Sequence, residues 1–190
     1  MSDSTLERIE KAINQLALQQ DELGAQLGAL EARLGATAAS GVAAGAEVIG
    51  FLDQFRAGEA LGEASVGAWI EVSDTACLKG GLRTIQCREG MHARLLEERI
   101  RELGAKPKAE ISAAVREAVM AQVSSTETTD LAKLDQFLSQ FPDVDAALQP
   151  IHDLADRLDG DPETQSLLRT IAQDERATLE FLHGAKAQLG

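Results

Sequence analysis

The chain has 190 residues, of which 44% are hydrophobic and 26% are charged, and its formal net charge is −13. The apolar share is enough for a folded core, and the net negative charge opposes binding to nucleic acid and to anionic lipid surfaces. Because residues 1–4 resemble no secretion signal and no apolar run reaches the roughly 18 residues that cross a bilayer, we expect a cytoplasmic protein that binds no membrane.

The composition predicts an all-α fold. Aromatic residues make up only 3% of the chain, Tyr is absent, and Ala, Leu, Gln, Glu and Arg recur throughout, a usage that favours helices over strands. The two cysteines, Cys77 and Cys87, fit neither a disulfide framework nor the spacing of a zinc site, so we expect buried or unreactive thiols.

Residues 6–34 carry a heptad repeat. Apolar side chains alternate at steps of three and four, with Gln20 at the one polar position. The pattern also fits an amphipathic helix that packs on its own domain, but such a helix usually has a wider apolar stripe. We therefore predict a coiled-coil oligomerisation helix over residues 1–34, which joins copies of the chain into a homo-oligomer. The core positions are Leu6, Ile9, Ile13, Leu16, Gln20, Leu23, Leu27, Leu30 and Leu34.

A linker and a helical domain follow the coiled coil. Residues 35–46 are mostly small and weakly patterned, which is typical of a hinge or a loose helical connector, and the domain then spans residues 47–190. Its second helix is expected to end at Gly104, while Pro142 and Pro150 are expected to break or kink its third helical region. The expected helical stretches are 47–72, 75–103, 111–123, 130–158 with its two prolines, and 163–187.

The domain contains an internal repeat. Residues 82–85, Leu-Arg-Thr-Ile, recur letter for letter at residues 168–171, an offset of 86 residues. The same offset aligns Glu89 with Glu175 and carries the start of the first domain helix onto the start of the third. The sequence therefore predicts two helical hairpins. Hairpins that run in the same direction need a long crossover, which residues 104–129 can supply.

Acidic residues and one histidine stand at spacings typical of a metal site. Glu89 and His92 form a Glu-x-x-His sequence, which places both side chains on one helix face about a turn apart. Glu59 precedes Glu89 by 30 residues, and the offset of the repeat carries Glu59 onto Asp145. Each half of the repeat thus carries one acidic residue in its first helical stretch and another in its second. The same offset carries His92 onto Thr178.

Over residues 48–182 the sequence resembles the ferritin-like superfamily in its rubrerythrin-type branch, most closely in residues 88–104 and 161–182. Members of that superfamily hold two metals with a Glu from each of two helices and a Glu-x-x-His from each of the other two. The resemblance implies a four-helix bundle that binds iron, with manganese as the alternative, and that reduces oxygen or peroxide. The implied metal ligands are Glu59, Glu89, His92, Asp145 and Glu175.

Two positions depart from the family pattern. Asp145 stands where a longer Glu is usual, and Thr178 stands where the second His belongs, so the second half of the site is degenerate. His152 lies two helical turns after Asp145 and is either a stand-in ligand or an ordinary surface histidine. His183 is expected at the surface.

Two functions follow from these observations. The first is a metal-carboxylate protein with redox or iron-handling chemistry. The second is a metal-free bundle that acts as an oligomeric scaffold or adaptor for protein partners, its carboxylates being remnants that are protonated or paired with arginines. A ferritin-type storage cage fits less well, because its shell must accommodate the N-terminal coiled coil.

Overall fold

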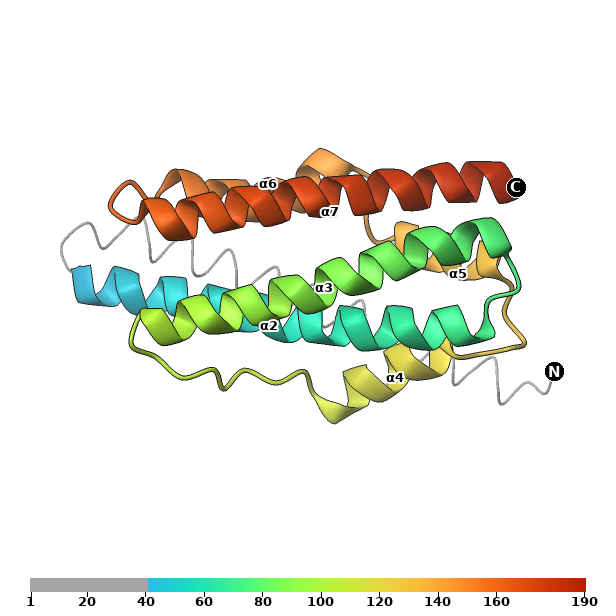
Figure 1. Ribbon diagram of the computed structural model, residues 1–190, viewed down its shortest axis with the longest axis horizontal. Helices are drawn as coiled ribbons and strands as arrows, with labels where there is room; N and C mark the ends of the chain where they lie inside the picture. The colour runs from blue at the N-terminus through green and yellow to red at the C-terminus, as the bar shows by residue number, and fades with distance from the viewer. Residues whose placement is uncertain (1–40) are drawn as a thin grey trace.

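Every regular element is an α-helix in the computed structural model, which describes residues 41–190 and their side chains from residue 45 on. The all-α prediction is therefore confirmed for this part of the chain (Figure 1). The predicted coiled coil over residues 1–34 and the start of the predicted linker, 35–40, lie outside the described residues. The helices are α2 (Gly41–Val72), α3 (Ala76–Glu102), α4 (Ala113–Val123), α5 (Asp130–Leu138), α6 (Val144–Asp156) and α7 (Pro162–Leu189).

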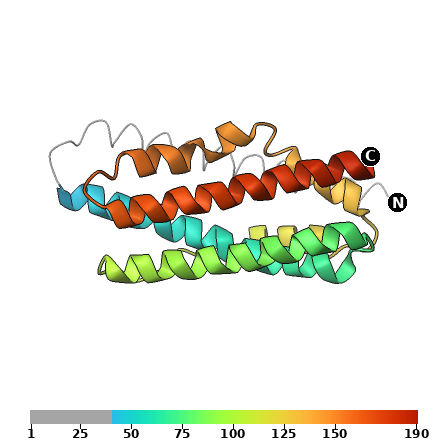
Figure 2. The same ribbon diagram turned by 45° about the horizontal axis from the view of Figure 1, so that its top comes forward.

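Helices α2 and α3 form an antiparallel hairpin and pack against each other along their lengths (Figures 1 and 2). Because α2 begins at Gly41, residues 41–46 of the predicted linker already belong to this helix. At the end of α3, Gly104 has a φ of +80°, and the amides of Gly104 and Ala105 donate to the carbonyls of Arg101 and Ile100. This Schellman motif requires a left-handed residue, which glycine supplies without strain, so α3 stops where the sequence predicts.

The second half of the domain follows the internal repeat. Shifting the bounds of α3 by 86 residues gives 162–188, and α7 spans Pro162–Leu189. The counterpart of α2 is divided into α5 and α6, and Pro142 lies in the break between them, as predicted. Pro150, in contrast, lies inside α6 without ending it. Helix α6 packs against α7, which also contacts α3 and α5. None of the helices in the described part of the chain combines the length and apolar character that crossing a membrane requires.

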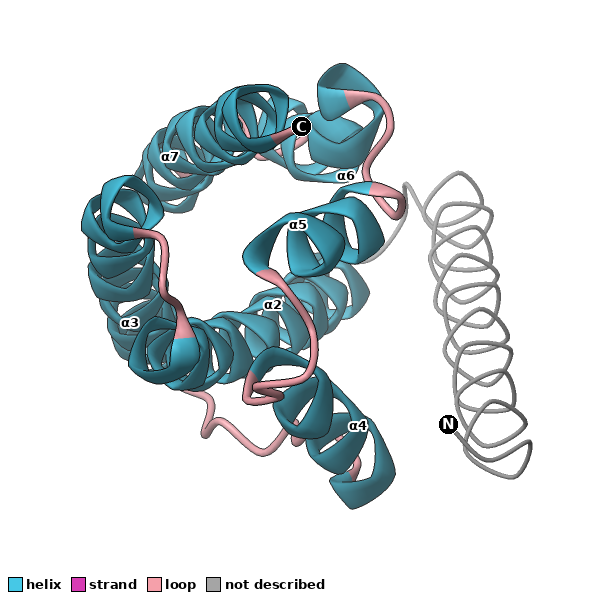
Figure 3. Ribbon diagram, turned by 90° about the vertical axis from the view of Figure 1, so that its right-hand side faces the viewer, coloured by secondary structure: helices cyan, strands magenta, loops and turns pink. Residues whose placement is uncertain are grey.

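The segment between the hairpins is held against α2. Its one helix, α4, contacts α2 and lies outside the ring that the other described helices form in end-on view (Figure 3). Before α4, a carboxylate oxygen of Asp53 accepts hydrogen bonds of 2.8 Å from the amides of both Lys108 and Ala109. Arg56 donates to the Ala109 carbonyl over 2.6 Å. These bonds satisfy backbone groups that a non-helical segment leaves open, so the connection is fixed in place.

The buried apolar residues form two clusters, which lie towards opposite ends of the long helices. Polar side chains stand between the clusters on each of α2, α3 and α7, and three of them, one from each helix, form the centre of the candidate site described below. They are Glu59 between Leu52 and Trp69, His92 between Ile85 and Leu96, and Glu175 between Ile171 and Leu179. The apolar packing above and below these three groups therefore limits the water that reaches them.

A buried carboxylate ties the start of α5 to the turn between α2 and α3. Asp130, only 9% exposed, accepts hydrogen bonds of 2.7 Å from the Trp69 indole and the Ser73 hydroxyl and one of 3.3 Å from the Thr75 amide. Burial alone raises the pKa of Asp130, but hydrogen bonds from Thr75, Trp69 and Ser73 outweigh it and hold the pKa below its ordinary value. The carboxylate is therefore ionised at neutral pH.

Replacing Asp130 by alanine is expected to lower the free energy of unfolding by about 3 kcal/mol, because buried donors then lose their acceptor. Since the folded-state pKa is lowered, the stabilisation is complete above the unfolded pKa of about 3.9 and is lost as the pH falls through the folded pKa. Urea unfolding of both proteins between about pH 2.5 and 7 measures the difference. Asp135→Ala, on the exposed side of the same helix, is the control and should change stability by less than about 0.5 kcal/mol. If the difference in unfolding free energy between the wild-type protein and Asp130→Ala does not narrow in acid, the ionised carboxylate of Asp130 is not the source of the stabilisation.

Candidate metal centre

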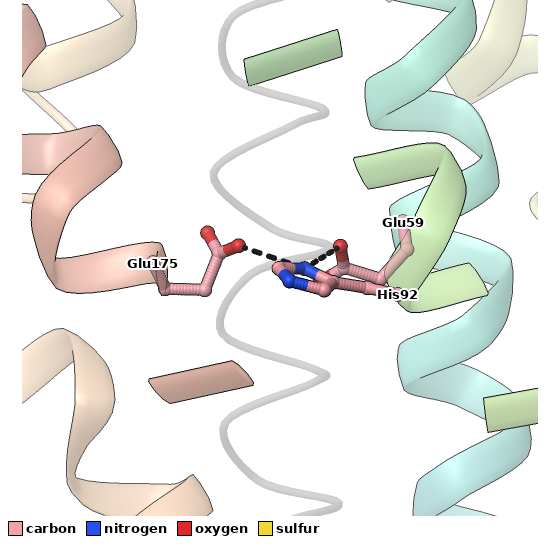
Figure 4. A group of neighbouring side chains, drawn as sticks. All are labelled: Glu59, His92 and Glu175. Carbon is pink, nitrogen blue, oxygen red and sulfur yellow. Dashed lines mark hydrogen bonds and ion pairs between the residues drawn. The ribbon is translucent and has the colours of Figure 1, made fainter. Parts of the chain in front are cut away.

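The candidate site is built around His92, which is 1% exposed in the middle of α3. An imidazole is rarely buried so completely without polar partners. Here α2 contributes Glu59, which is 4% exposed. Helix α7 contributes Glu175, which points towards His92 from the side across from α2 and α3 (Figure 4). The two helices of the first hairpin and the distant helix α7 thus direct one polar side chain each towards a common point.

The distances within this cluster suit a shared cation. The Nδ1 atom of His92 lies 3.1 Å from Oε2 of Glu59 and 3.4 Å from Oε1 of Glu175. One nitrogen and two carboxylate oxygens from these residues all lie within 4.8 Å of one another. Oε1 of Glu175 is buried and has no well-formed hydrogen bond, so this oxygen retains a lone pair for another partner.

The other ring nitrogen of His92 is occupied by a fourth acid. Nε2 lies 3.1 Å from Oδ2 of Asp174, whose second oxygen is 3.6 Å from Nε of Arg88. When Nε2 carries its proton and donates to Asp174, Nδ1 is left as the lone-pair nitrogen that faces Glu59 and Glu175. A carboxylate that fixes the tautomer of a histidine in this way is the usual outer partner of a metal-bound imidazole.

Glu89 lies beside the cluster and shares a hydrogen bond with Glu59. Its carboxylate occupies space that a side chain on Gly62 would fill, so the glycine allows α2 and α3 to enclose it. Burial and the charges of Glu59 and Glu175 raise the pKa of Glu89 to about 9. Burial likewise raises the pKa of Glu59, although the hydrogen bond from His92 opposes the effect. In the metal-free protein, Glu89 is therefore protonated at neutral pH.

His92 compensates the remaining negative charge. Burial alone lowers the pKa of this imidazole, but hydrogen bonds to Glu175, Glu59 and Asp174 outweigh it and raise the pKa to about 10. In the metal-free protein the ring is thus an imidazolium that donates from both nitrogens. A divalent cation at Nδ1 would replace that proton and supply the same compensating charge.

The donor set fits iron or manganese better than structural zinc. Carboxylate oxygens with a single imidazole are the ligands that these metals prefer, whereas structural zinc sites depend on thiolates. Both cysteines are exposed and free, which excludes buried thiols from the two expected alternatives, and neither belongs to the cluster. Oε1 of Glu175 and Nδ1 of His92, once this nitrogen has lost its proton, are where the residues present offer coordination.

Not all of the residues predicted for the site meet. The structure brings together Glu59, Glu89, His92 and Glu175 but not Asp145. The side chain of Asp145 lies at the surface of α6, 80% exposed, where it pairs with Arg176. Asp145 lies in the first turn of α6, and its carboxylate turns to Arg176 rather than to the interior. Neither His152 nor His183 belongs to the described metal-ligand group.

Thr178 occupies the position where the family pattern has a second histidine. It is 4% exposed, and its hydroxyl oxygen has no hydrogen-bond partner among the described residues. The side chain therefore faces the interior, as the repeat predicts, but it offers only a weak ligand. Together with the outward position of Asp145, this leaves the second half of the site without its two expected ligands.

Sequence reasoning missed Asp174, although the repeat contains a signal for it. The offset of 86 residues aligns Asp174 with Arg88, so equivalent positions in the two hairpins carry opposite charges, and the two side chains approach each other. Such a pair across a repeat predicts a contact between the second helices of the two hairpins. That contact places Asp174 next to His92, one turn along α3 from Arg88.

Comparisons with protein-family models, with curated proteins and with solved structures gave no significant match to this sequence.

Proposed function

We propose that the protein is a ferritin-like, rubrerythrin-type metal-carboxylate protein that binds one iron ion. The observation that carries this proposal is the convergence of Glu59, His92 and Glu175 from three helices, with ligand atoms within 4.8 Å of one another. Glu59, Glu175 and Nδ1 of His92 are the proposed ligands, and Glu89 joins them after losing its proton. Manganese is the alternative ion, since the same donors suit it.

The protein residues have separate tasks in this proposal. Asp174 orients the imidazole through Nε2, the glutamates balance the charge of the ion, and the two apolar clusters limit access of water. A bound iron ion would supply one-electron chemistry towards oxygen or peroxide. We propose a single ion rather than two, because Asp145 lies at the surface and Thr178 replaces an imidazole.

A metal-free scaffold or adaptor is the second candidate function. It is favoured by the network around His92, whose two ring nitrogens already have carboxylate partners without any ion. In that case the predicted coiled coil over residues 6–34 would assemble copies of the chain and present the helical domain to protein partners.

Metal content distinguishes the two functions. After anaerobic loading with iron(II) and desalting, the wild-type chain is expected to retain about one iron per chain by plasma mass spectrometry, since two carboxylates and an imidazole suffice for stable binding. His92→Ala and Glu175→Gln are each expected to retain less than about a tenth of that amount, because each removes one ligand. Loading with manganese(II) in parallel shows which ion the site prefers.

Asp145→Asn is the matched control for this experiment. It alters an acid that the resemblance implicates but that lies at the surface, so it should retain wild-type iron. Glu175→Gln preserves the shape of its residue and guards against loss of metal through misfolding, which circular dichroism checks. If the wild-type protein retains no metal, the scaffold function is supported instead. If all variants retain iron equally, the ion binds elsewhere.

A further inference from the structure

A cavity of about 410 Å³ extends from the candidate metal centre towards α5. Its volume falls in the range of small-molecule sites, and side chains from all six described helices line it. Most of the wall is apolar, including Val66, Leu82, Ile85 and Phe137. Glu89 and Glu175 form part of the wall at the metal centre, but most of the cavity lies outside the site described above.

A buried cation lines this cavity. Lys133 on α5 is only 2% exposed, and its ammonium group has no hydrogen bond or ion pair with another described residue. The acid on the same face of the helix is Asp130, one turn earlier, whose oxygens already accept from Trp69, Ser73 and Thr75. Burial lowers the pKa of Lys133 and only the charge of Asp130 opposes this shift, so an anion in the cavity would stabilise the ammonium group.

The polar groups mark different places along the cavity. The hydrogen bond from Trp69 to Asp130 shows that the start of α5 lies beside Trp69 of α2. The metal centre lies beside Glu59 of the same helix. Trp69 and Glu59 are ten residues apart in α2, which corresponds to about 15 Å along the helix axis. Lys133 lies one turn along α5 from Asp130. Thr178, whose buried hydroxyl has no partner, lines the cavity as well.

We propose that this cavity binds an organic monoanion with an aliphatic body, such as a medium-chain carboxylate. The carboxylate of the ligand pairs with Lys133, and its aliphatic part lies along the apolar wall towards Thr178. The carboxylate of Glu175 repels a second negative charge, so the other end of the ligand is neutral. The inference does not depend on metal binding, because neither Lys133 nor the apolar wall is part of the metal centre.

Helix α4 offers a route of entry. It contributes Val119, Gln122 and Val123 to the wall of the cavity, yet none of its residues is buried. Few apolar contacts therefore oppose its displacement, and local opening at this helix costs less than separation of the long helices.

The test is a binding titration with decanoate and with the neutral 1-decanol, each below its aggregation limit. Trp69 is the only Trp of the chain and lines the cavity, so its fluorescence reports occupancy directly. In the full-length wild-type protein, decanoate is expected to bind at least about tenfold more tightly than 1-decanol, since a charge-assisted pair adds to the same aliphatic contacts. Lys133→Met should remove this preference, and Lys133→Arg should largely keep it.

Further variants separate this site from nonspecific binding. Lys106→Met, at an exposed position, should leave the preference for decanoate unchanged. Val66→Phe keeps Lys133 but fills the cavity, so it should weaken both ligands at least about tenfold even if Lys133→Met folds poorly. Equal affinities for decanoate and 1-decanol in the wild-type protein would overturn the proposal. So would an unchanged preference in Lys133→Met, or the absence of binding by either ligand in both fluorescence and calorimetry.

Discussion

Replacing His92 by alanine is expected to lower the free energy of unfolding of the metal-free protein by about 3 to 5 kcal/mol at pH 6 to 7. The imidazolium lies within 3.4 Å of Glu59, Asp174 and Glu175, and without it these acids are left together in a largely buried site. Part of the cost appears as protonation of the glutamates, because unpaired buried carboxylates have raised pKa values. Urea unfolding of the metal-free proteins measures the difference.

The pH dependence identifies the origin of this effect. Because the pKa of His92 is raised to about 10, its stabilising contribution is complete below the unfolded pKa of about 6.5 and is lost as the pH rises through about 10. The difference between the wild-type protein and His92→Ala should therefore narrow between about pH 6.5 and 10. This direction is opposite to that expected for Asp130, whose contribution is lost in acid.

His183→Ala is the control for the loss of an imidazole. His183 is only partly buried, so its removal should change stability by less than about 0.5 kcal/mol at any pH in this range. A loss below about 1 kcal/mol for His92→Ala, or a loss that does not depend on pH, would show that the carboxylates do not rely on the imidazolium.

The helical arrangement could be predicted because its determinants are local in sequence. Gly104 ends α3 through a left-handed residue, and Pro142 lies in the break between α5 and α6. The repeat of residues 82–85 at residues 168–171 also holds for the helix bounds, because those of α7 are those of α3 shifted by about 86 residues. Pro150 does not break its helix. The second half of α6 continues beyond it, because the buried Ile151 and Leu154 follow it and packing offsets the lost hydrogen bond.

The candidate site was only partly predictable, because orientation depends on tertiary packing. The spacing of Glu89 and His92 fixes one helix face, and the repeat adds Glu59 and Glu175. The repeat does not bring Asp145 into the site, because the counterpart of α2 is divided into two helices and Asp145 lies exposed in the first turn of the second one. Contacts between hairpins, such as that of Asp174 with His92, require knowledge of how the helices are placed in space.

Arg99 shows the same limitation at the surface. The alternating charges of residues 97–102 favour a solvated helix face. The Arg99 side chain is nevertheless only 12% exposed, since it donates to the Thr164 hydroxyl and pairs with Asp161 and Glu163 at the start of α7. A charge pattern within one helix does not reveal the acidic residues that lie beside it at the start of another helix, distant in sequence.

The affinity for a divalent metal ion is expected to rise about a hundredfold per pH unit between about pH 6 and 8. In the metal-free protein His92 and Glu89 both hold a proton at neutral pH, with pKa values of about 10 and about 9. Both protons must leave before Nδ1 and the carboxylate can coordinate the ion. Calorimetric titration with manganese(II) in two buffers of different ionisation enthalpy should therefore report the release of about two protons per ion at pH 7.

Glu89→Gln distinguishes the proton that Glu89 releases on metal binding from the one that His92 releases. The amide resembles the protonated acid that it replaces, so the metal-free fold should lose less than about 1 kcal/mol, while metal binding becomes weaker and releases only about one proton, from His92. The affinity of this variant should then rise only about tenfold per pH unit. Glu98→Gln, at an exposed position of α3, should behave like the wild-type protein. If Glu89→Gln still releases about two protons, Glu89 is no ligand and the second proton comes from Glu59 or another group of the cluster.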